Sequence, residues 1–230
     1  MAKIKLGALA GQVSGSIGTY TFAHNRGGAY VRLRSIPDKF TTPYAMAAKS
    51  RLALCSSNWS LLQPEQRASW TEWARQNPVT DTLGEKRPLD GHQAYVSLAV
   101  RLVLAGELLP TTPPGKPHPD GIETITVTAD TGTGAFQVAF TPATLPTGLQ
   151  LWVQGCPVAN PAVNFVKNRL KFIMNGADTT PSPLDIETDF ELRFGVPATG
   201  STVVIWASVF DPTTGLLSMP TEGRATVTHT

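Results

Sequence analysis

The chain has 230 residues, of which 41% are hydrophobic and 16% charged; this balance is typical of a globular protein and excludes an intrinsically disordered one. Its 19 prolines and 20 glycines exceed average usage and favour a turn-rich fold over a compact enzyme-like α/β domain. The positive charge is concentrated near the N-terminus: the first 40 residues carry a net charge of +5, whereas the whole chain carries only +2. That charge comes from six basic residues and one acidic residue: Lys3, Lys5, Arg26, Arg32, Arg34, Lys39 and Asp38.

Residues 1–42 form a basic, glycine-punctuated arm with too few core-forming side chains to fold alone. The pair Gly27-Gly28 separates two strand-like runs, which predicts a β-hairpin. The side chains expected to face one another across it are Tyr20 and Phe22 on the first strand and Tyr30 and Arg32 on the second. Because an isolated hairpin is marginally stable in water, we expect another chain or the rest of the molecule to complete this arm.

Membrane segments, leader sequences and cysteine chemistry are not indicated. No apolar run approaches the length of a membrane span, and Lys3 and Lys5 precede only the short apolar run 6–10, so we expect the chain to be made and kept as written. Cys55 and Cys156 lie in different regions without a CxxC pair or nearby histidines, which argues against a disulfide framework and a zinc site. Cys55 is expected to pack on a helix face.

Residues 43–108 predict a small module of three helices. The first lies within residues 45–62, the second covers 64–76, and the third begins after Asp90 and ends near Gly106. The expected packing residues are Leu52, Cys55, Trp59 and Leu62 on the first helix, Trp70, Trp73 and Ala74 on the second, and Tyr95, Leu98, Ala99 and Leu102 on the third. The three tryptophans are large enough to form most of the core of such a module.

The second half of the chain predicts β structure. Residues 109–121 contain five prolines and predict a stiff, extended linker. Residues 122–230 then alternate apolar and polar positions in seven runs: Ile125 and Val127; Phe136, Val138 and Phe140; Leu149, Leu151 and Val153; Leu170 and Phe172; Phe190, Leu192 and Phe194; Val203, Ile205, Ala207 and Val209; Ala225 and Val227. This pattern predicts an immunoglobulin-like or fibronectin-type-III-like β-sandwich. The predicted fold class is therefore α+β, with an N-terminal β-rich extended arm, a small α-helical module and a C-terminal sandwich.

Short motifs in the first half occur in the same order in a family of small proteins encoded by tailed bacteriophages and prophages. They are NRGGAYVR at residues 25–32, a match to an L-T-x-x-Q-R-x-x-W helix at Leu62, Gln66, Arg67 and Trp70, and the pair Asn77-Pro78. Gln63 stands where the family commonly has threonine. The chain resembles this family over roughly its first half, and a β-sandwich often follows in its members.

The resemblance implies a structural protein of the virion, made in the host cytoplasm, whose partners are other virion proteins and copies of itself. We expect a capsid-associated decoration or head-stabilising protein anchored by its N-terminal arm, because such arms bind by adding strands to a neighbour's sheet edge. A neck or tail component is the first alternative. The alternative from another class is an adhesin-like module that binds host glycan through the sandwich.

Catalysis is the least supported interpretation of the sequence. The four histidines, His24, His92, His118 and His229, are scattered over regions that no local motif brings together. The HExxH, GxSxG, Walker and GxGxxG spacings do not occur. We therefore expect no enzymatic activity, no cofactor, no metal site and no small-molecule substrate.

Two kinds of surface are candidates for binding. The basic arm, with Tyr20, Phe22 and Tyr30 interleaved, is compatible with nucleic acid, but its modest charge density favours an acidic protein surface. Arg26, Arg32 and Arg34 are the expected contact residues there, because arginine pairs bidentately with carboxylates. In the sandwich, Trp152 and Trp206 are expected either to form an exposed aromatic patch for a protein or a sugar, or to be buried if the strand register is shifted by one residue.

Overall fold

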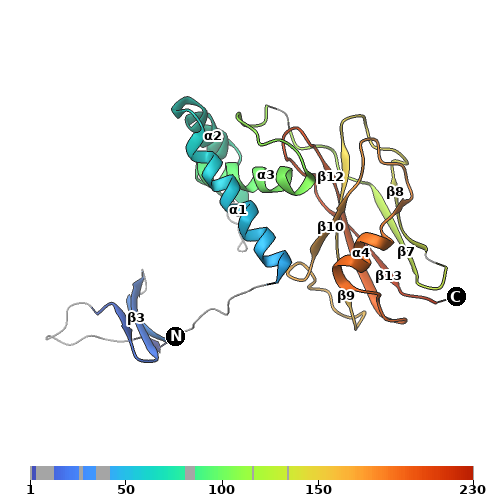
Figure 1. The fold of residues 1–230 in the computed structure, drawn as a ribbon, viewed down its shortest axis with the longest axis horizontal. Helices are drawn as coiled ribbons and strands as arrows, with labels where there is room; N and C mark the ends of the chain where they lie inside the picture. Colours follow the sequence, from blue (N-terminus) through green and yellow to red (C-terminus); the bar gives the residue numbers. More distant parts are fainter. Residues whose placement is uncertain are drawn as a thin grey trace. The chain divides into compact units, whose positions relative to one another are not determined.

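The computed structural model describes residues 2–3, 13–25, 28–34, 42–80, 86–115, 117–133 and 135–229. The chain divides into two compact units, Met1–Ala47 and Ala48–Thr230. Over the described residues the fold is mixed α+β, with four helices and four mostly antiparallel sheets, none of them closed (Figure 1). The helices are α1 (Pro43–Leu61), α2 (Pro64–Gln76), α3 (Gly91–Ala105) and α4 (Glu187–Phe194). Within these same residues no helix combines the length and the apolarity needed to cross a bilayer.

The N-terminal unit contains a single four-stranded antiparallel sheet in the order β1-β4-β3-β2. Its strands are β1 (Ala2–Lys3), β2 (Gly15–Ile17), β3 (Tyr20–Asn25) and β4 (Gly28–Leu33). The predicted hairpin is confirmed as β3 and β4. All of the residues whose exposure is described in this unit are half-buried or exposed, so the sheet is one layer without a core.

The predicted facing of side chains across this hairpin was wrong. Gly28, which we expected in the turn, begins β4, and it pairs with Asn25. The pairing of the described residues joins even-numbered with odd-numbered positions. The opposed pairs are Tyr20 with Leu33, Thr21 with Arg32, Phe22 with Val31, and Ala23 with Tyr30. Directly opposed residues share a face, so the two aromatic residues of β3 lie on one face, and Tyr30 and Arg32 lie on the other.

The three helices expected in residues 43–108 form, with bounds close to the prediction. The backbone N–H of Gln63 donates to Oε1 of Gln66 at 2.9 Å, which satisfies one donor at the start of α2. Asp90 precedes α3, and Gly106 ends it in the left-handed conformation, with φ of 83°. Glycine adopts that conformation without steric cost, which is why it stops a helix so effectively.

The helices share a small core. Its buried members are Cys55, Leu62, Trp70, Tyr95, Leu98, Ala99 and Leu216. Trp59 and Trp73 are partly buried against it, and the Trp59 ring lies 5.5 Å from the Tyr95 ring. Leu52 is 54% exposed, so its predicted place in the packing face of α1 was wrong. The reason is that the polar and aromatic contacts between α1 and α3 come from the C-terminal half of α1, beginning with Ser56.

The C-terminal half contains two larger antiparallel sheets, in the orders β10-β9-β12-β13 and β11-β8-β7, and a small ribbon lies between α2 and α3. The strands of the sheets are β7 (Thr124–Asp130), β8 (Ala135–Thr141), β9 (Gln150–Val158), β10 (Lys171–Asn175), β11 (Leu184–Asp185), β12 (Thr202–Phe210) and β13 (Thr221–Thr226). The ribbon pairs β5 (Val79–Thr80) with β6 (Lys86–Arg87). Six of the seven predicted runs thus lie on or beside strands.

A single hydrophobic core joins the two larger sheets. Val127 and Val138 enter it from one sheet, and Val153 and Ile205 enter it from the other. A Cβ added at Gly223 of β13 would lie 2.8 Å from Val127, which shows how closely the two layers approach there. The alternation read from the sequence therefore identified the inward positions of β7, β8, β9 and β12 correctly. It was wrong for Leu170 and Phe172, which pack outside this core, while Ile173 and Met174 of β10 enter it after a shift in register.

The predicted strand with Phe190, Leu192 and Phe194 is helix α4, so this prediction was wrong. Phe190 and Phe194 are four residues apart and therefore also share a helix face. Their rings are 4.9 Å apart, and Phe190 packs 4.7 Å from Phe136 of β8. Leu192, which a strand would turn inward with them, is 75% exposed. A spacing of four positions fits both periodicities, and the tertiary contact with β8 selected the helix.

The helical region and the β region pack against each other within the unit 48–230. The C-terminal end of α3 approaches the sheet (Figure 1), where Leu102 packs with Trp152 and Phe210. Arg101 donates from Nη1 to the carbonyl of Gly215 at 3.3 Å. The proline-rich segment 109–121 runs beside both regions, because Trp70 Nε1 donates to the carbonyl of Thr111 at 3.3 Å, and a ring nitrogen of His118 lies 2.9 Å from the carbonyl of Leu217.

Candidate functional site

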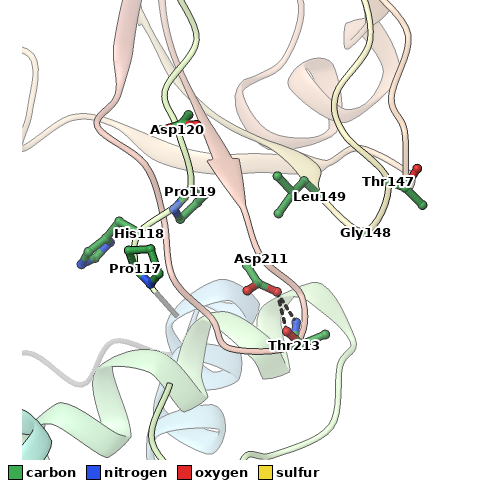
Figure 2. Close-up of a pocket in the computed structure, with 9 residues that line it drawn as sticks. All are labelled: Pro117, His118, Pro119, Asp120, Thr147, Gly148, Leu149, Asp211 and Thr213. Atoms are coloured by element: carbon green, nitrogen blue, oxygen red, sulfur yellow. Dashed lines mark hydrogen bonds between the residues drawn. The ribbon is translucent and has the colours of Figure 1, made fainter. Parts of the chain in front are cut away.

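An open hollow of about 480 Å³ is formed where the proline-rich segment meets two loops of the β region (Figure 2). Its lining residues are Pro117, His118, Pro119, Asp120, Thr147, Gly148, Leu149, Asp211 and Thr213. The combination of two carboxylates and an imidazole raises the question of acid–base chemistry.

Asp211 and His118 of this hollow are engaged in holding the chain together. One carboxylate oxygen of Asp211, Oδ1, accepts hydrogen bonds from the backbone N–H and the hydroxyl of Thr213, at 2.9 and 2.6 Å. The other, Oδ2, accepts from the Thr214 hydroxyl at 2.8 Å. The His118 ring contacts the Leu217 carbonyl. These contacts order the turn after β12.

The thiols and the buried tyrosine are poor nucleophiles for a physical reason. Burial raises the pKa of Cys55, and burial raises that of Cys156 although Arg169 nearby lowers it. Burial, with a smaller contribution from Cys55, raises the pKa of Tyr95 to about 12. Thiolate and phenolate forms are therefore rare at neutral pH. Among the described residues, no group of three His, Cys, Asp or Glu side chains is close enough to hold a metal ion.

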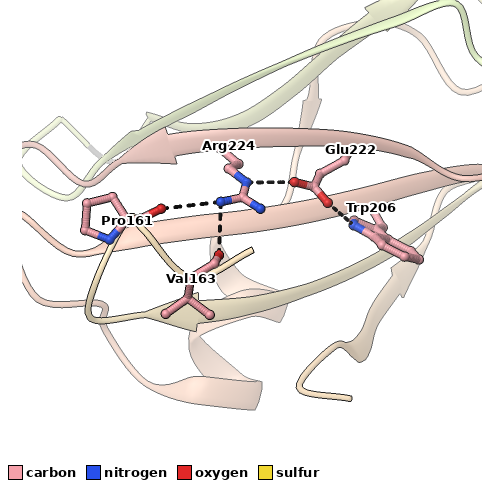
Figure 3. Close-up of polar contacts among 5 residues, drawn as sticks. All are labelled: Pro161, Val163, Trp206, Glu222 and Arg224. Carbon is pink, nitrogen blue, oxygen red and sulfur yellow. Dashed lines mark hydrogen bonds and ion pairs between the residues drawn. The ribbon is translucent and has the colours of Figure 1, made fainter. Parts of the chain in front are cut away.

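A polar network on the outer face of the β region joins Trp206, Glu222 and Arg224 (Figure 3). Trp206 Nε1 donates to Glu222 Oε2 at 2.8 Å, and Arg224 Nε donates to Glu222 Oε1 at 2.7 Å. Arg224 Nη1 also donates to the carbonyl of Val163 at 3.1 Å. Burial alone would raise the pKa of Glu222, but the hydrogen bonds from Arg224 and Trp206 outweigh it and hold that pKa below its ordinary value of 4.5.

The exposed patch of Trp152 and Trp206, one of two alternatives read from the sequence, is not formed. Both residues face away from the core between the sheets, as that alternative required. Trp152 is nevertheless only 3% exposed, because Leu102 of α3 and Phe210 cover it. Trp206 is half-buried and tied to Glu222. A helix from another region, rather than a register shift, buried Trp152.

The arm residues divide between the two faces of the N-terminal sheet. Tyr20 and Phe22 share their face with Val31 and Leu33 through direct pairing, and Ile17 joins them through its pairing with Tyr20. Three of these five apolar residues are strongly exposed: Ile17 by 71%, Leu33 by 69% and Tyr20 by 51%. This set of five residues is called the apolar face below.

The opposite face is polar. It carries Tyr30 and Arg32 together with Ser16 and Thr21, whose hydroxyls lie 2.9 Å apart. Arg34, directly after β4, is exposed. Arg26 lies outside the described residues. The predicted aromatic and basic residues of the arm therefore do not form one surface, because Tyr20 and Phe22 are grouped with aliphatic side chains instead.

Sequence reasoning missed Ile17, Val31 and Leu33 as surface residues, although the signal was present. In a hairpin with a two-residue loop, each even-numbered residue pairs with an odd-numbered one, and paired residues share a face of the sheet. Ile17, Val31 and Leu33 are odd-numbered, and their partners Tyr20 and Phe22 are even-numbered, so all five lie on one face. It also missed Phe165, which is 95% exposed. No periodicity marks a single aromatic residue in a loop, so nothing in the sequence pattern pointed to it.

Comparisons with known proteins add no further constraint: no family model, no characterised protein and no solved structure matches this chain significantly.

Proposed function

We propose that this chain is a non-enzymatic structural protein of a bacteriophage virion, anchored to its neighbours by the N-terminal sheet. The proposal joins the motif resemblance in the first half of the chain to one structural observation. That observation is the apolar face, which has no covering layer among the described residues of its own unit.

A one-layer sheet with an uncovered apolar face gains little stability by itself. An apolar face stabilises a sheet through the surface that it removes from water, and a face that stays exposed removes little. Burying a side chain such as Leu33, which is 69% exposed, contributes about 1.5 to 3 kcal/mol when burial is complete. The apolar face therefore has much to gain from a protein surface, which favours a protein partner over nucleic acid.

The open edges of the sheet suggest how the register with that partner is set. Strand β1 pairs with β4 at Val31 and Tyr30, and β2 pairs with β3 from Tyr20 to Phe22. Among the described residues of the unit, no further strand pairs with the outer side of β1 or β2, or with the parts of β4 and β3 that extend beyond them. A neighbouring chain that adds a strand there would gain main-chain hydrogen bonds while its side chains cover the apolar face.

Position in the particle and fold type belong to the same proposal. A capsid-associated decoration or head-stabilising protein is the first candidate, and a neck or tail component would use the same anchor.

We further infer that the two-layer β region is related to immunoglobulin-like or fibronectin-type-III-like sandwiches, since two antiparallel sheets share its core. The glycan-binding alternative loses support, because its aromatic platform required an exposed Trp152.

The test is co-sedimentation with particles of the encoding phage that were assembled without this chain. The variant Tyr20→Ser with Leu33→Ser removes two side chains from the apolar face. The matched control, Tyr30→Ser with Arg32→Ser, changes the same two strands on the polar face. We expect the first variant to lose stoichiometric binding and the control to retain most of it. Equal binding by both variants, or binding lost only in the control, would contradict the proposed anchor.

A further inference from the structure

A second hollow, of about 320 Å³, lies in the helical region, where residues of α2, α3 and the β5–β6 ribbon line it together with Leu216. Among the described residues that line it, the ionisable side chains are all basic: Lys86, Arg101 and His118. The hollow in Figure 2 differs, because Asp120 and Asp211 contribute carboxylates to its wall. A concave surface lined by one sign of charge concentrates ions of the opposite sign, so this second hollow favours an anion.

The side chain of Arg101, on α3, holds a charge that its surroundings leave uncompensated. It is half-buried, and its Nη1 donates to the carbonyl of Gly215 at 3.3 Å. Neither of the ion pairs between described residues includes it. Burial lowers the pKa of Arg101, because the charged form loses contact with water. Keeping a cation partly out of water without a counter-ion costs free energy, which an incoming anion would offset.

The other two basic residues reach the hollow from separate segments. Lys86 of β6 lines it, whereas the next residue, Arg87, does not, as expected when successive side chains of a strand point to opposite sides. His118 belongs to the proline-rich segment, and one of its ring nitrogens lies 2.9 Å from the carbonyl of Leu217. The tertiary structure therefore gathers this basic lining from three segments far apart in the chain.

The rest of the wall is largely apolar and aromatic. Trp73 is partly buried there, and its ring lies 5.9 Å from the ring of Trp70 in an edge-to-face arrangement. Leu98, which is 3% exposed, lines the hollow together with Leu89 and Leu216. Ligand pockets typically combine such a wall with a few polar groups, and their volumes begin at about 300 Å³. The hollow therefore suits a small molecule with an anionic end and an apolar body.

We propose that this hollow binds a small organic oxyanion, a carboxylate or a phosphate ester with an apolar body, and that Arg101 binds its charged end. The planar guanidinium donates hydrogen bonds in a fork that matches both carboxylate and phosphate oxygens. Lys86 adds positive charge, and Trp73 packs against the body of the ligand. The residues involved are not those of the apolar face, so the inference goes beyond the proposed virion role and does not rest on it.

Two probes of equal shape test the role of charge in the original full-length chain. Benzoate and benzamide differ chiefly in charge, and isothermal titration calorimetry at constant ionic strength measures both affinities. Phenyl phosphate is a third probe. At least one of the two anions should bind about 10-fold or more tightly than benzamide, because hydrogen bonds to a charged group are stronger than those to a neutral one. The tighter anion identifies the charged group that the site prefers. The proposal is overturned if neither anion binds more tightly than benzamide.

A variant of the arginine tests which residue is responsible. Arg101→Met should weaken binding of the preferred anion by about 10- to 100-fold. Without ligand, its melting temperature should stay the same or rise, because an apolar side chain replaces an uncompensated cation. A lower melting temperature with unchanged anion affinity would limit Arg101 to its contact with Gly215 and overturn the proposal. If this variant does not fold, the comparison of benzoate, phenyl phosphate and benzamide still decides.

Two further variants serve as controls. Arg87→Met removes the same charge beside the hollow and should change the affinity by less than about 2-fold; a loss equal to that of Arg101→Met would indicate general electrostatic attraction instead of a site. Asp81→Asn with Glu85→Gln removes two carboxylates in a segment outside the described residues. Anion binding should persist in this variant. Binding that occurs only there would show that a carboxylate of the chain itself occupies the hollow, which contradicts the proposal.

The particle experiment and this one can fail separately. Tyr20→Ser with Leu33→Ser should bind the preferred anion as the original chain does, and Arg101→Met should still bind particles through the apolar face.

Discussion

The hairpins β3–β4 and β7–β8 share a topology but differ in burial. Both are antiparallel pairs with apolar residues on one face. In β7–β8 that face is buried, with Val138 fully inaccessible and Phe136 only 4% exposed, because a second sheet covers it. In β3–β4 the corresponding residues include Leu33 at 69% exposure. Strand pairing is thus satisfied locally in both, but burial requires a second layer.

This difference teaches that an alternating pattern identifies a face and not what covers it. The pattern of Phe136, Val138 and Phe140 and that of Tyr20 and Phe22 are equally regular. In the first case the covering layer is supplied by the same unit. In the second, no described residue of the unit supplies it, and the proposed anchor rests on this uncovered apolar surface.

The largest effect should come from truncating one phenylalanine in each hairpin. Phe136→Ala should lower the free energy of unfolding of the unit 48–230 by about 3 to 5 kcal/mol, because it leaves a cavity beside Phe190. Phe22→Ala, on the uncovered face, should change the free energy of unfolding of the N-terminal sheet by less than about 0.5 kcal/mol. All five tryptophans lie in residues 48–230, so urea denaturation followed by tryptophan fluorescence measures the effect of Phe136→Ala. Amide hydrogen exchange in β3 and β4 measures the effect of Phe22→Ala, and a loss comparable to that of Phe136→Ala would show that the two hairpins do not differ in this way.

An intermediate effect should come from the contact between α3 and the β region. Gly215 has φ of 77°, and a Cβ there would lie 2.9 Å from the carbonyl oxygen of Leu98. Gly215→Ala should therefore cost about 2 to 4 kcal/mol, from backbone strain and from overpacking. Thermal unfolding of the full chain measures it.

Gly200→Ala is the matched control for this substitution. Its φ of 82° is similar, but a Cβ there meets nothing within 4 Å, so we expect only the strain of about 1 kcal/mol. The difference between the two variants measures how tightly α3 is fixed to the β region. Equal losses would show that this contact contributes nothing beyond backbone strain.

The smallest effect should come from pH acting on the network around Glu222. Because its folded-state pKa is below 4.5, the carboxylate stabilises the fold above that value, and this stabilisation is lost as the pH falls through the folded-state pKa. The side chain is 36% exposed, so solvent screening limits the effect to about 0.5 kcal/mol. The original chain should exceed Glu222→Gln in stability at pH 6, and the two should converge below about pH 4.

Urea denaturation at several pH values measures this convergence. A difference that persists at pH 3, or that grows as the pH falls, would contradict the role given to the carboxylate. None of the ion pairs between described residues lies within the N-terminal sheet, so we expect no such pH-dependent stabilisation there.

Much of the local structure was predictable from the sequence. Helix α2 and the bounds of α3 follow from Pro64, Asp90 and Gly106, whose backbone and capping preferences act within one turn. The inward positions of β8 and β12 follow from alternation. The existence of the β3–β4 hairpin was clear, although its facing was misjudged by parity.

Three features depended on the tertiary structure. Phe190 and Phe194 fit a strand or a helix, and contact with β8 selected the helix. Trp152 was read correctly as facing outward from the sheet core, but α3 covered it. Phe165 is exposed in a loop in which Val166 is buried and the carbonyl of Val163 accepts a hydrogen bond from Arg224, and no local pattern predicts this arrangement.

By itself, the sequence determined where helices α2 and α3 begin and end and which segments of the β region alternate, since these choices depend on neighbours a few positions away. Only the tertiary structure decided which apolar faces are covered, because coverage depends on segments far apart in the chain. The apolar face of the N-terminal sheet stays exposed, whereas Trp152 is covered by a residue of α3.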